Sequence, residues 1–243
     1  MITTLKSDVQ ILARLLRGRS LQGTHQQQLE SFYGPQAEQY DAFRERLLHG
    51  RKRLLEQLDV RPEYTLVELG AGTGRNLRFL DQPLQSFKKI EIVDLCPSLL
   101  AIAKNQYQRM NNIHVVEADA TTYQPDQSVD RVYLSYALTM IPDWKRTIEN
   151  AVAMLKPGGK LGVVDFYVSA DTANVGNVQH GQMTRKFWRG WFAHDGVNLN
   201  PAHLQYLQTI CRPLYLKEEF GSVPYLPFLK APYYIFVGQK PDS

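Results

Sequence analysis

The chain has 243 residues, of which 44% are hydrophobic and 21% are charged. This balance is typical of soluble globular proteins and excludes an extensively disordered chain. The formal net charge of +4 is compatible with an anionic membrane surface or with nucleic acid and selects neither. No apolar run approaches the roughly 18 residues of a membrane-spanning helix, and the start lacks a secretory signal pattern, so we expect a cytoplasmic protein.

The first 60 residues are predicted to form a helical extension that covers the functional site. Residues 5–19 place apolar side chains at helical spacing among several Lys and Arg residues, which predicts a short basic amphipathic helix. Such a helix either lies on a membrane interface or packs on its own domain, and both interpretations stay open. After a polar stretch at 22–28, the segment 29–58 has a helical pattern interrupted at Gly34-Pro35.

From Tyr64 onward the pattern alternates between strands and helices. We predict strands at 65–69, 89–94, 113–119, 129–136 and 159–166, and helices near 75–81, 97–109 and 143–155. Such alternation is typical of α/β proteins, in which a parallel sheet carries helices on both faces. Residues 211–223 and 231–240 are candidates for a final pair of strands. We therefore assign 61–243 to one domain, with a helical, aromatic-rich insertion at about 168–212.

A glycine-rich turn follows the first predicted strand. In the stretch ELGAGTGRN, Gly70, Gly72 and Gly74 alternate, whereas a dinucleotide fingerprint spaces its glycines as GxGxxG. Glycines let the backbone adopt positive φ and approach a ligand closely. A pyrophosphate would be held at the N-terminus of the following helix, but a cofactor without phosphates needs the loop to pass under a sugar or an amino acid.

The stretch VELGAGTG resembles motif I of the class I S-adenosylmethionine-dependent methyltransferases, with Glu68 in the acidic position. Later stretches resemble the same family in the same order. IVDLCPSLL places Asp94 after the second strand, VVEADATTY places Asp119 after the third, and MLKPGGKLGVVDF matches the family's helix, turn and fifth strand. The resemblance implies a Rossmann-like, mostly parallel seven-stranded sheet, with S-adenosylmethionine as cofactor and S-adenosylhomocysteine as product.

The resemblance also implies roles within the cofactor site. Asp94 would accept hydrogen bonds from both ribose hydroxyls, Asp119 would meet the adenine amino group, and Ala120 would supply a backbone N–H. An acidic residue at position 94 also suits a nicotinamide dinucleotide, so it does not discriminate between cofactors. The expected cofactor-binding residues are Tyr33, Glu68, Gly70, Ala71, Gly72, Gly74, Asp94, Leu95, Asp119, Ala120 and Ser135.

Outside this core, the stretches at 32–55, 187–207 and 221–240 are similar to the methyltransferases that convert diacylglyceryl-homoserine into the betaine lipid diacylglyceryl-trimethylhomoserine. This similarity implies three N-methylations of a lipid at the inner face of the membrane, and a separate aminocarboxypropyl transferase that supplies the substrate. The stretch YLSYALTMIP lacks the NPPY-type signature for methylation of planar amides, and no track of interleaved basic and aromatic residues is present. Nucleic acid is therefore not an expected partner.

Methylation of an amine predicts aromatic residues around the acceptor. Repeated N-methylation yields a quaternary ammonium that has no N–H to donate, and aromatic faces attract such a cation. The candidates for such an aromatic cage are Tyr33, Tyr40, Tyr136 and Trp191. Ordinary packing in the core also explains each of these four residues.

A base is needed for the proton that the acceptor amine loses. His194, followed by Asp195, is the first candidate, ahead of His49 and His180. Water is an alternative base, and a lone histidine is also explained as a structural residue. Transfer otherwise depends mainly on positioning, because the sulfonium is already an excellent leaving group.

The homoserine carboxylate favours an arginine partner. Arg44, Arg51 and Arg185 are the candidates, although each is also explained as a surface or helix-face charge. The stretch VPYLPFLKAPYY and the basic N-terminal helix are candidates for a membrane-facing rim. The two cysteines lack metal-ligand spacing, so we predict buried small side chains and no metal site.

Two other functions stay open. The chain could methylate a soluble amine or a quinone-like acceptor, or it could be a noncatalytic partner that retains the fold for assembly. The intact glycine turn with Asp94 and Asp119 argues against the noncatalytic reading.

Overall fold

The computed structural model describes residues 23–34, 45–170, 178–193, 196–224 and 226–241. The amphipathic helix predicted at 5–19 lies outside these ranges. So do three of the predicted site residues, Tyr40, Arg44 and His194.

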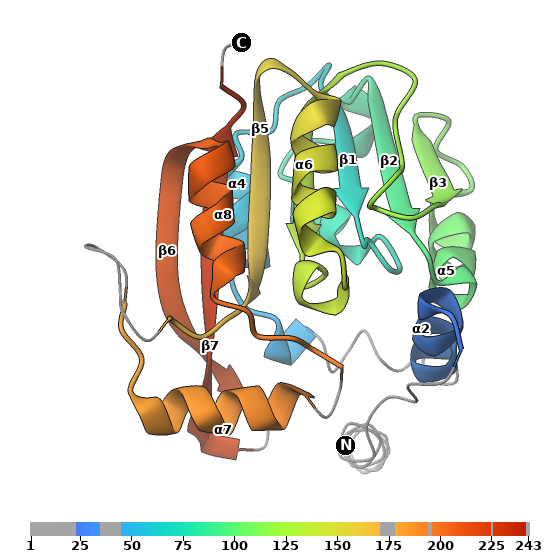
Figure 1. Ribbon diagram of the computed structural model, residues 1–243. Helices are drawn as coiled ribbons and strands as arrows, with labels where there is room; N and C mark the ends of the chain where they lie inside the picture. The colour runs from blue at the N-terminus through green and yellow to red at the C-terminus, as the bar shows by residue number, and fades with distance from the viewer. Residues whose placement is uncertain (1–22, 35–44, 171–177, 194–195, 225, 242–243) are drawn as a thin grey trace.

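A seven-stranded sheet forms the centre of the molecule, in the order β3-β2-β1-β4-β5-β7-β6 (Figure 1). The first five strands in this order are parallel to one another, whereas β7 is antiparallel to both β5 and β6. This arrangement confirms the predicted fold class, including the mostly parallel sheet and the final pair of strands. The strands are β1 (Thr65–Leu69), β2 (Lys89–Asp94), β3 (Ile113–Glu117), β4 (Val129–Ser135), β5 (Leu155–Phe166), β6 (Arg212–Val223) and β7 (Leu226–Gln239).

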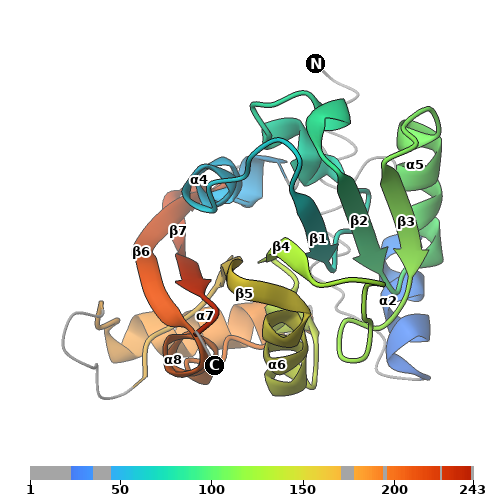
Figure 2. The ribbon, with the colours of Figure 1, turned by 90° about the horizontal axis from the view of Figure 1, so that it is seen from above.

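Helices cover both faces of this sheet. On one face, α4 (Arg51–Gln57) and α5 (Pro97–Tyr107) pack on apolar side chains that include Leu66. On the other face, α6 (Trp144–Met154) and α8 (Ala202–Ile210) pack on a second cluster that includes Val67. Figure 2 shows α4 on one side of the strands and α6 and α8 on the other. Because both faces are covered, all five residues of β1 are buried, as expected for parallel strands.

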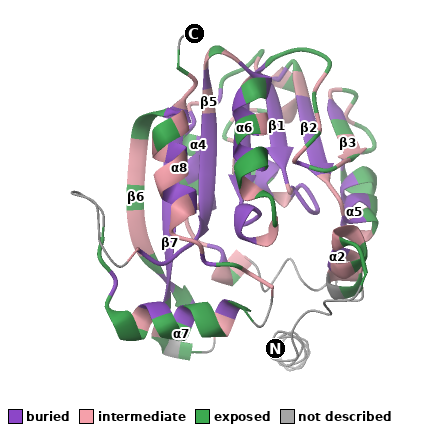
Figure 3. Ribbon diagram, viewed as in Figure 1, coloured by how far each residue is buried: buried purple, intermediate pink, exposed green. Residues whose placement is uncertain are grey.

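The remaining elements lie at the carboxyl end of the parallel strands or connect them. Helix α2 (His25–Tyr33) packs beside α5, and α7 (Gln182–Ala193) follows β5 (Figure 1). Three 3-10 helices complete the described part: η2 (Arg75–Phe79), η3 (Leu84–Ser86) and η4 (Leu138–Met140). The edge strand β6 is largely exposed, whereas the central strands are buried (Figure 3).

Several boundaries differ from the sequence prediction for local reasons. The polar stretch at 22–28 contains the start of α2, because Thr24 and Gln27 form a reciprocal capping box. The helix predicted at 75–81 is the shorter 3-10 helix η2. Strand β5 begins at Leu155, before the Pro157-Gly158-Gly159 turn, and pairs with β4 through a register shift.

Of the described helices, none is long and apolar enough to cross a bilayer. Cys96 and Cys211 are buried and not disulfide-bonded.

Candidate functional site

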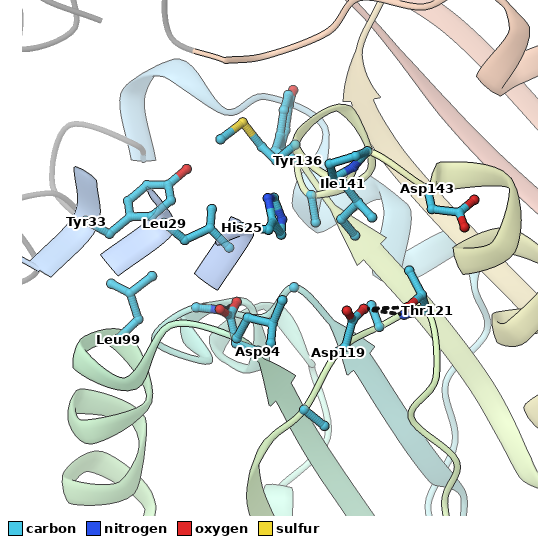
Figure 4. A pocket seen from close by; sticks show the side chains of 18 residues that line it. His25, Leu29, Tyr33, Asp94, Leu99, Asp119, Thr121, Tyr136, Ile141 and Asp143 are labelled. Atoms are coloured by element: carbon cyan, nitrogen blue, oxygen red, sulfur yellow. Dashed lines mark hydrogen bonds between the residues drawn. The ribbon is translucent and has the colours of Figure 1, made fainter. Parts of the chain in front are cut away.

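A cavity of about 250 Å³ opens at the carboxyl ends of β1, β2 and β4 (Figure 4). The strand order reverses here, because β1 pairs with β2 on one side and with β4 on the other. Open α/β sheets bind their ligands at such a switch point. The residues that line the cavity are His25, Leu29, Tyr33, Gly70, Gly72, Asp94, Leu95, Leu99, Ala118, Asp119, Ala120, Thr121, Tyr136, Ala137, Met140, Ile141, Pro142 and Asp143.

The glycine turn forms the floor of this cavity. Gly70, Gly72 and Gly74 have φ values of 68°, 58° and 69°, a region that only glycine enters at little cost. The N–H groups of Gly70 and Ala71 donate to the carbonyl of Val93 at 2.8 and 3.1 Å. A Cβ atom on Gly70 would lie 2.4 Å from the Cβ of Ala137. The turn is therefore pressed against the loop after β4, and a larger residue at position 70 would force the two apart.

Two aspartates line the cavity at the ends of adjacent strands: Asp94 is the last residue of β2, and Asp119 follows β3. Asp94 Oδ2 accepts from Gly72 N at 2.7 Å, and Oδ1 accepts from Cys96 N at 2.8 Å. Asp119 Oδ1 accepts from the backbone and the hydroxyl of Thr121 at 2.8 and 2.7 Å. Within the described part of the chain, Asp119 Oδ2 accepts no hydrogen bond. The aspartates thus hold their loops in place and still present carboxylate oxygens to the cavity.

Helix α2 closes the side of the cavity opposite the aspartates (Figure 4). His25, Leu29 and Tyr33 face inward from successive turns of this helix. On another face of α2, Glu30 Oε2 accepts from the N–H of Ser98 at 3.2 Å and from the Cys96 thiol at 3.1 Å, and Oε1 accepts from the Ser98 hydroxyl. Glu30 therefore attaches α2 to the N-terminus of α5, directly beside Asp94.

Tyr136 occupies the end of β4 and forms part of the cavity wall. Its φ of 55° is unusual for a residue with a large side chain and is typical of functional positions held by their surroundings. The hydroxyl donates to the carbonyl of His49 at 2.8 Å, and the ring packs on Phe166 with centroids 4.5 Å apart. Burial raises the pKa of Tyr136 well above its usual value. Tyr136 therefore offers the cavity a neutral aromatic surface.

The acidic residue of the glycine motif lies beneath the turn and does not reach the cavity. Glu68 is fully buried, and its carboxylate accepts from Asn76 Nδ2 at 2.6 Å and from the Tyr133 hydroxyl at 2.8 Å. Arg51 donates to Asn76 Oδ1 at 3.2 Å, which extends the network. Glu68 thus supports the turn from the core and does not line the cavity, and its predicted part in cofactor binding stays a prediction.

Other predicted cofactor residues also lie outside the main cavity. Gly74 caps η2, and a Cβ there would meet Ile92 at 2.7 Å. Ala71 and Ser135 line a smaller cleft on the far side of the turn. These residues shape the turn, whereas Tyr33, Gly70, Gly72, Asp94, Leu95, Asp119 and Ala120 line the cavity.

The two predicted carboxylate partners that the structure describes do not line the cavity. Arg51 donates to the carbonyl of Leu48 at 3.0 Å as well as to Asn76. Arg185, on α7, donates to the carbonyls of His180 and Ala170 at 2.9 and 3.3 Å. Both side chains are buried and direct these donors to protein groups, and neither lines the cavity. Their assignment to a substrate carboxylate stays a prediction.

Two predicted bases and one predicted cage residue also lie elsewhere. His49 Nε2 is 3.0 Å from the carbonyl of Ser222. His180 Nδ1 accepts from the N–H of Ser169 at 2.9 Å, and burial lowers the pKa of His180. Trp191 packs with Phe187 on α7, with ring centroids 5.7 Å apart. None of these three lines the cavity, and their roles in the reaction stay predictions.

Sequence reasoning missed part of the cavity wall. His25 and Leu29 belong to the glutamine-rich start of α2, whose helical cap at Thr24 was the available signal. Met140 and Ile141 come from the loop after β4, which Asp165 anchors by accepting from the N–H and hydroxyl of Thr139 at 3.0 and 2.8 Å. Burial raises the pKa of Asp165 to about 7, although the donors around it oppose this change. No local pattern in the sequence indicates that contact.

Comparison with known proteins agrees with this geometry. A family model described as "Methyltransferase domain" matches residues 66–159. The demethylmenaquinone methyltransferase of Tropheryma whipplei is 26% identical over 60% of this chain and 62% of its own length. The N-methyltransferase NodS of Bradyrhizobium japonicum, solved with S-adenosyl-l-homocysteine, has a TM-score of 0.59 at 17% identity and covers 79% of this chain and 85% of its own. The [4+2]-cyclase SpnF has a TM-score of 0.66 at 15% identity, over 93% and 99%.

The chain therefore has the class I fold of the S-adenosylmethionine-dependent methyltransferases, which confirms S-adenosylmethionine over a dinucleotide as the expected cofactor. The cavity fits this group. Among the described residues that line it are three aspartates and no Lys or Arg. Such a lining favours a cationic sulfonium with a nucleoside and disfavours a pyrophosphate.

Proposed function

We propose that this protein is an S-adenosylmethionine-dependent N-methyltransferase that trimethylates the homoserine amine of diacylglyceryl-homoserine. The observation that carries the methyltransferase part is the cavity at the switch point, with Gly72 and Asp94 on one wall and Tyr33 and Tyr136 on the others. The acceptor part rests on the similarity of the flanking stretches and on the aromatic side chains of Tyr33 and Tyr136 in the cavity wall.

The chain's own residues would hold the cofactor from three sides. Asp94 accepts from the ribose hydroxyls while it keeps Gly72 in place, and Asp119 Oδ2 accepts from the adenine amino group. Helix α2 covers the bound nucleoside with Leu29 and Tyr33. When bound, S-adenosylmethionine supplies an electrophilic methyl group on a sulfonium.

Positioning would then provide much of the rate. The acceptor amine must be neutral and lie in line with the transferred methyl group. The rings of Tyr33 and Tyr136 offer aromatic faces to the ammonium that forms, which a cation–π interaction stabilises by about 0.5–2 kcal/mol. His25 is the described histidine that lines the cavity, which makes it a better candidate than His49 or His180 to accept the proton released by the amine.

A quinone-like acceptor is the second candidate. The demethylmenaquinone methyltransferase that matches this chain at 26% identity favours it, and the apolar side chains of Met140 and Ile141 in the cavity wall suit a flat, hydrophobic ring. The chain matches only part of that relative's length, so this acceptor too is a proposal.

Mass spectrometry of the products separates these acceptors. The purified protein would be incubated with S-adenosylmethionine and either diacylglyceryl-homoserine or a demethylated quinone, with Asp94→Ala as the control with weakened cofactor binding. Three successive methyl additions to the lipid, reduced with Asp94→Ala at a limiting cofactor concentration, are the expected result. Methyl transfer to the quinone alone would replace the lipid proposal, and failure of S-adenosylmethionine to raise the melting temperature would favour a noncatalytic role.

A further inference from the structure

An exposed apolar face lies at the same end of the molecule as the cavity. It consists of Met183 and Phe187 on α7 and of Phe220, Leu226 and Phe228 on the β6–β7 hairpin, and we refer to it as the docking face. The Phe228 side chain is 99% exposed and Met183 is 84% exposed. A phenylalanine that is fully exposed to water loses the free energy that burial of its ring would provide, so a cluster of such residues marks an interaction surface.

The position of the docking face follows from the strand register. Phe166, the last residue of β5, pairs with Tyr233 of the antiparallel strand β7. Because β7 begins at Leu226, residues 226–232 extend past the carboxyl end of the parallel sheet by roughly 20 Å. The cavity opens at that same end of the sheet. Figure 1 shows α7 crossing the lower end of the β6–β7 hairpin.

The segment just before α7 contacts the hairpin. The ring of His180 packs on Phe220 with centroids 5.3 Å apart. Trp188 and Phe192 of α7 are buried in the hydrophobic cluster that also includes Val223 and Ala231 of the hairpin. The two parts of the docking face therefore adjoin the same core.

The exposed charged side chains on α7 and on residues 226–232 are all basic. Beside Phe220 on β6, Glu219 is paired with Arg53 at 2.8 Å. Lys186 and Arg189 on α7 and Lys230 on β7 are exposed, and neither α7 nor residues 226–232 contain an acidic residue. A helix with an apolar outer face flanked by Lys and Arg is suited to the interface of an anionic bilayer, where each basic residue contributes attraction to the head groups. Two copies meeting by this face in a symmetric dimer would instead bring like charges together.

We propose that the docking face binds an anionic lipid bilayer, with Met183, Phe187 and Phe228 inserted among the acyl chains and Lys186, Arg189 and Lys230 at the head groups. This orientation turns the end of the sheet that carries the cavity toward the membrane. The membrane contact is thereby assigned to α7 and the hairpin. This orientation would bring the cavity close to a lipid substrate, an advantage that rests on the proposed lipid acceptor. Binding to the bilayer can be measured without any methyl transfer.

Vesicle sedimentation tests this proposal. The full chain would be mixed with vesicles of phosphatidylcholine and phosphatidylglycerol that contain no acceptor lipid, and with vesicles of phosphatidylcholine alone. We expect clear binding to the anionic vesicles and at least tenfold weaker binding to the neutral ones. The double variant Phe187→Ser/Phe228→Ser should lose at least tenfold in binding to anionic vesicles, and Lys186→Gln/Arg189→Gln/Lys230→Gln should lose a similar factor.

Leu214→Ser is the matched control. Leu214 is a 45% exposed leucine near the start of β6, at the opposite end of that strand from the hairpin, and its replacement should leave vesicle binding unchanged. Equal binding by the wild type and the Phe187→Ser/Phe228→Ser variant would place the membrane contact elsewhere and overturn the proposal. A wild-type dimer that this variant converts to a monomer, without vesicle binding by either, would assign the face to a second copy. Because the vesicles lack the acceptor, these outcomes are independent of whether the lipid is methylated.

Discussion

The Oδ2 atom of Asp94 accepts a hydrogen bond from the backbone N–H of Gly72 across 2.7 Å, although 22 residues separate the two in the sequence. This bond ties the glycine turn after β1 to the end of β2. The same carboxylate accepts from the N–H of Cys96, the residue directly before α5, at 2.8 Å. One side chain thus sets the positions of both loops against which the ribose of a nucleoside would lie.

Gly72→Val tests whether the turn is the cofactor site. Gly72 has a φ of 58° and lines the cavity, so a branched side chain both strains the backbone and occupies ligand space. We expect S-adenosylmethionine affinity, measured by titration calorimetry, to fall by at least a hundredfold while circular dichroism shows a folded protein. Unchanged affinity would mean that the cofactor binds elsewhere.

Asp94→Ala should weaken cofactor binding by about 1.5–3 kcal/mol, which corresponds to roughly tenfold to more than a hundredfold in Kd. The loss combines the missing acceptor with a looser turn at Gly72. Asp126→Ala is the control, because the Asp126 side chain is 93% exposed and pairs with Lys89. A similar loss in both variants would point to a general charge effect.

Glu30→Ala should detach α2 from α5. The substitution removes the acceptor for the Ser98 N–H and hydroxyl and for the Cys96 thiol, so the helix that carries Tyr33 is held less firmly over the cavity. We expect faster dissociation of S-adenosylmethionine in stopped-flow displacement. Ser31→Ala, on the same helix, removes only a hydrogen bond to the carbonyl of Gln28 and should leave the rate unchanged.

Tyr136→Phe and Tyr136→Ala separate the hydroxyl of this residue from its ring. The hydroxyl donates to the carbonyl of His49, so Tyr136→Phe should cost about 1 kcal/mol of unfolding free energy and change kcat little. Tyr136→Ala removes the aromatic wall and should lower kcat substantially. A large fall in kcat with Tyr136→Phe would instead give the hydroxyl a direct role in the reaction.

His203 should make the protein less stable in mild acid. This histidine on α8 is buried against Trp144, with ring centroids 4.6 Å apart, and neither ring nitrogen has a hydrogen-bond partner in the described part of the chain. Burial lowers the pKa of His203 from 6.5 to about 4. The unfolded chain therefore binds a proton below pH 6.5 that the folded chain takes up only near pH 4, so the unfolding free energy falls as the pH drops between these values.

The variant His203→Leu isolates this effect. Its unfolding free energy, measured by urea denaturation from pH 7 to pH 4.5, should decline less steeply than that of the wild type, with the difference approaching about 3 kcal/mol at the acid end. The difference between the two proteins is the informative quantity, because Asp165, whose pKa is raised to about 7, changes stability in the opposite direction in both. Parallel pH profiles would show that His203 is already accessible to protons in the folded state.

The sequence by itself determined the sheet and the floor of the site. Alternating strand and helix patterns are local signals, and they located β1, β2 and the final strand pair within a few residues. The alternating glycines and the acidic residues at 94 and 119 likewise reflect local backbone demands, and Gly70, Gly72, Asp94 and Asp119 do line the cavity.

Tertiary structure alone decided the roles of residues that depend on distant partners. Glu68 can lie buried beneath the turn because Tyr133 and Asn76 donate hydrogen bonds to its carboxylate. Arg185 donates hydrogen bonds to the carbonyls of Ala170 and His180. The amphipathic pattern of α7 shows a helix with an apolar face, but the pattern cannot indicate that Trp188 faces the core while Met183 faces water. That distinction depends on which side of α7 packs on the core, where the ring of Phe192 lies 4.6 Å from that of Phe166 on β5. Contacts between segments so far apart in the chain leave no local signal.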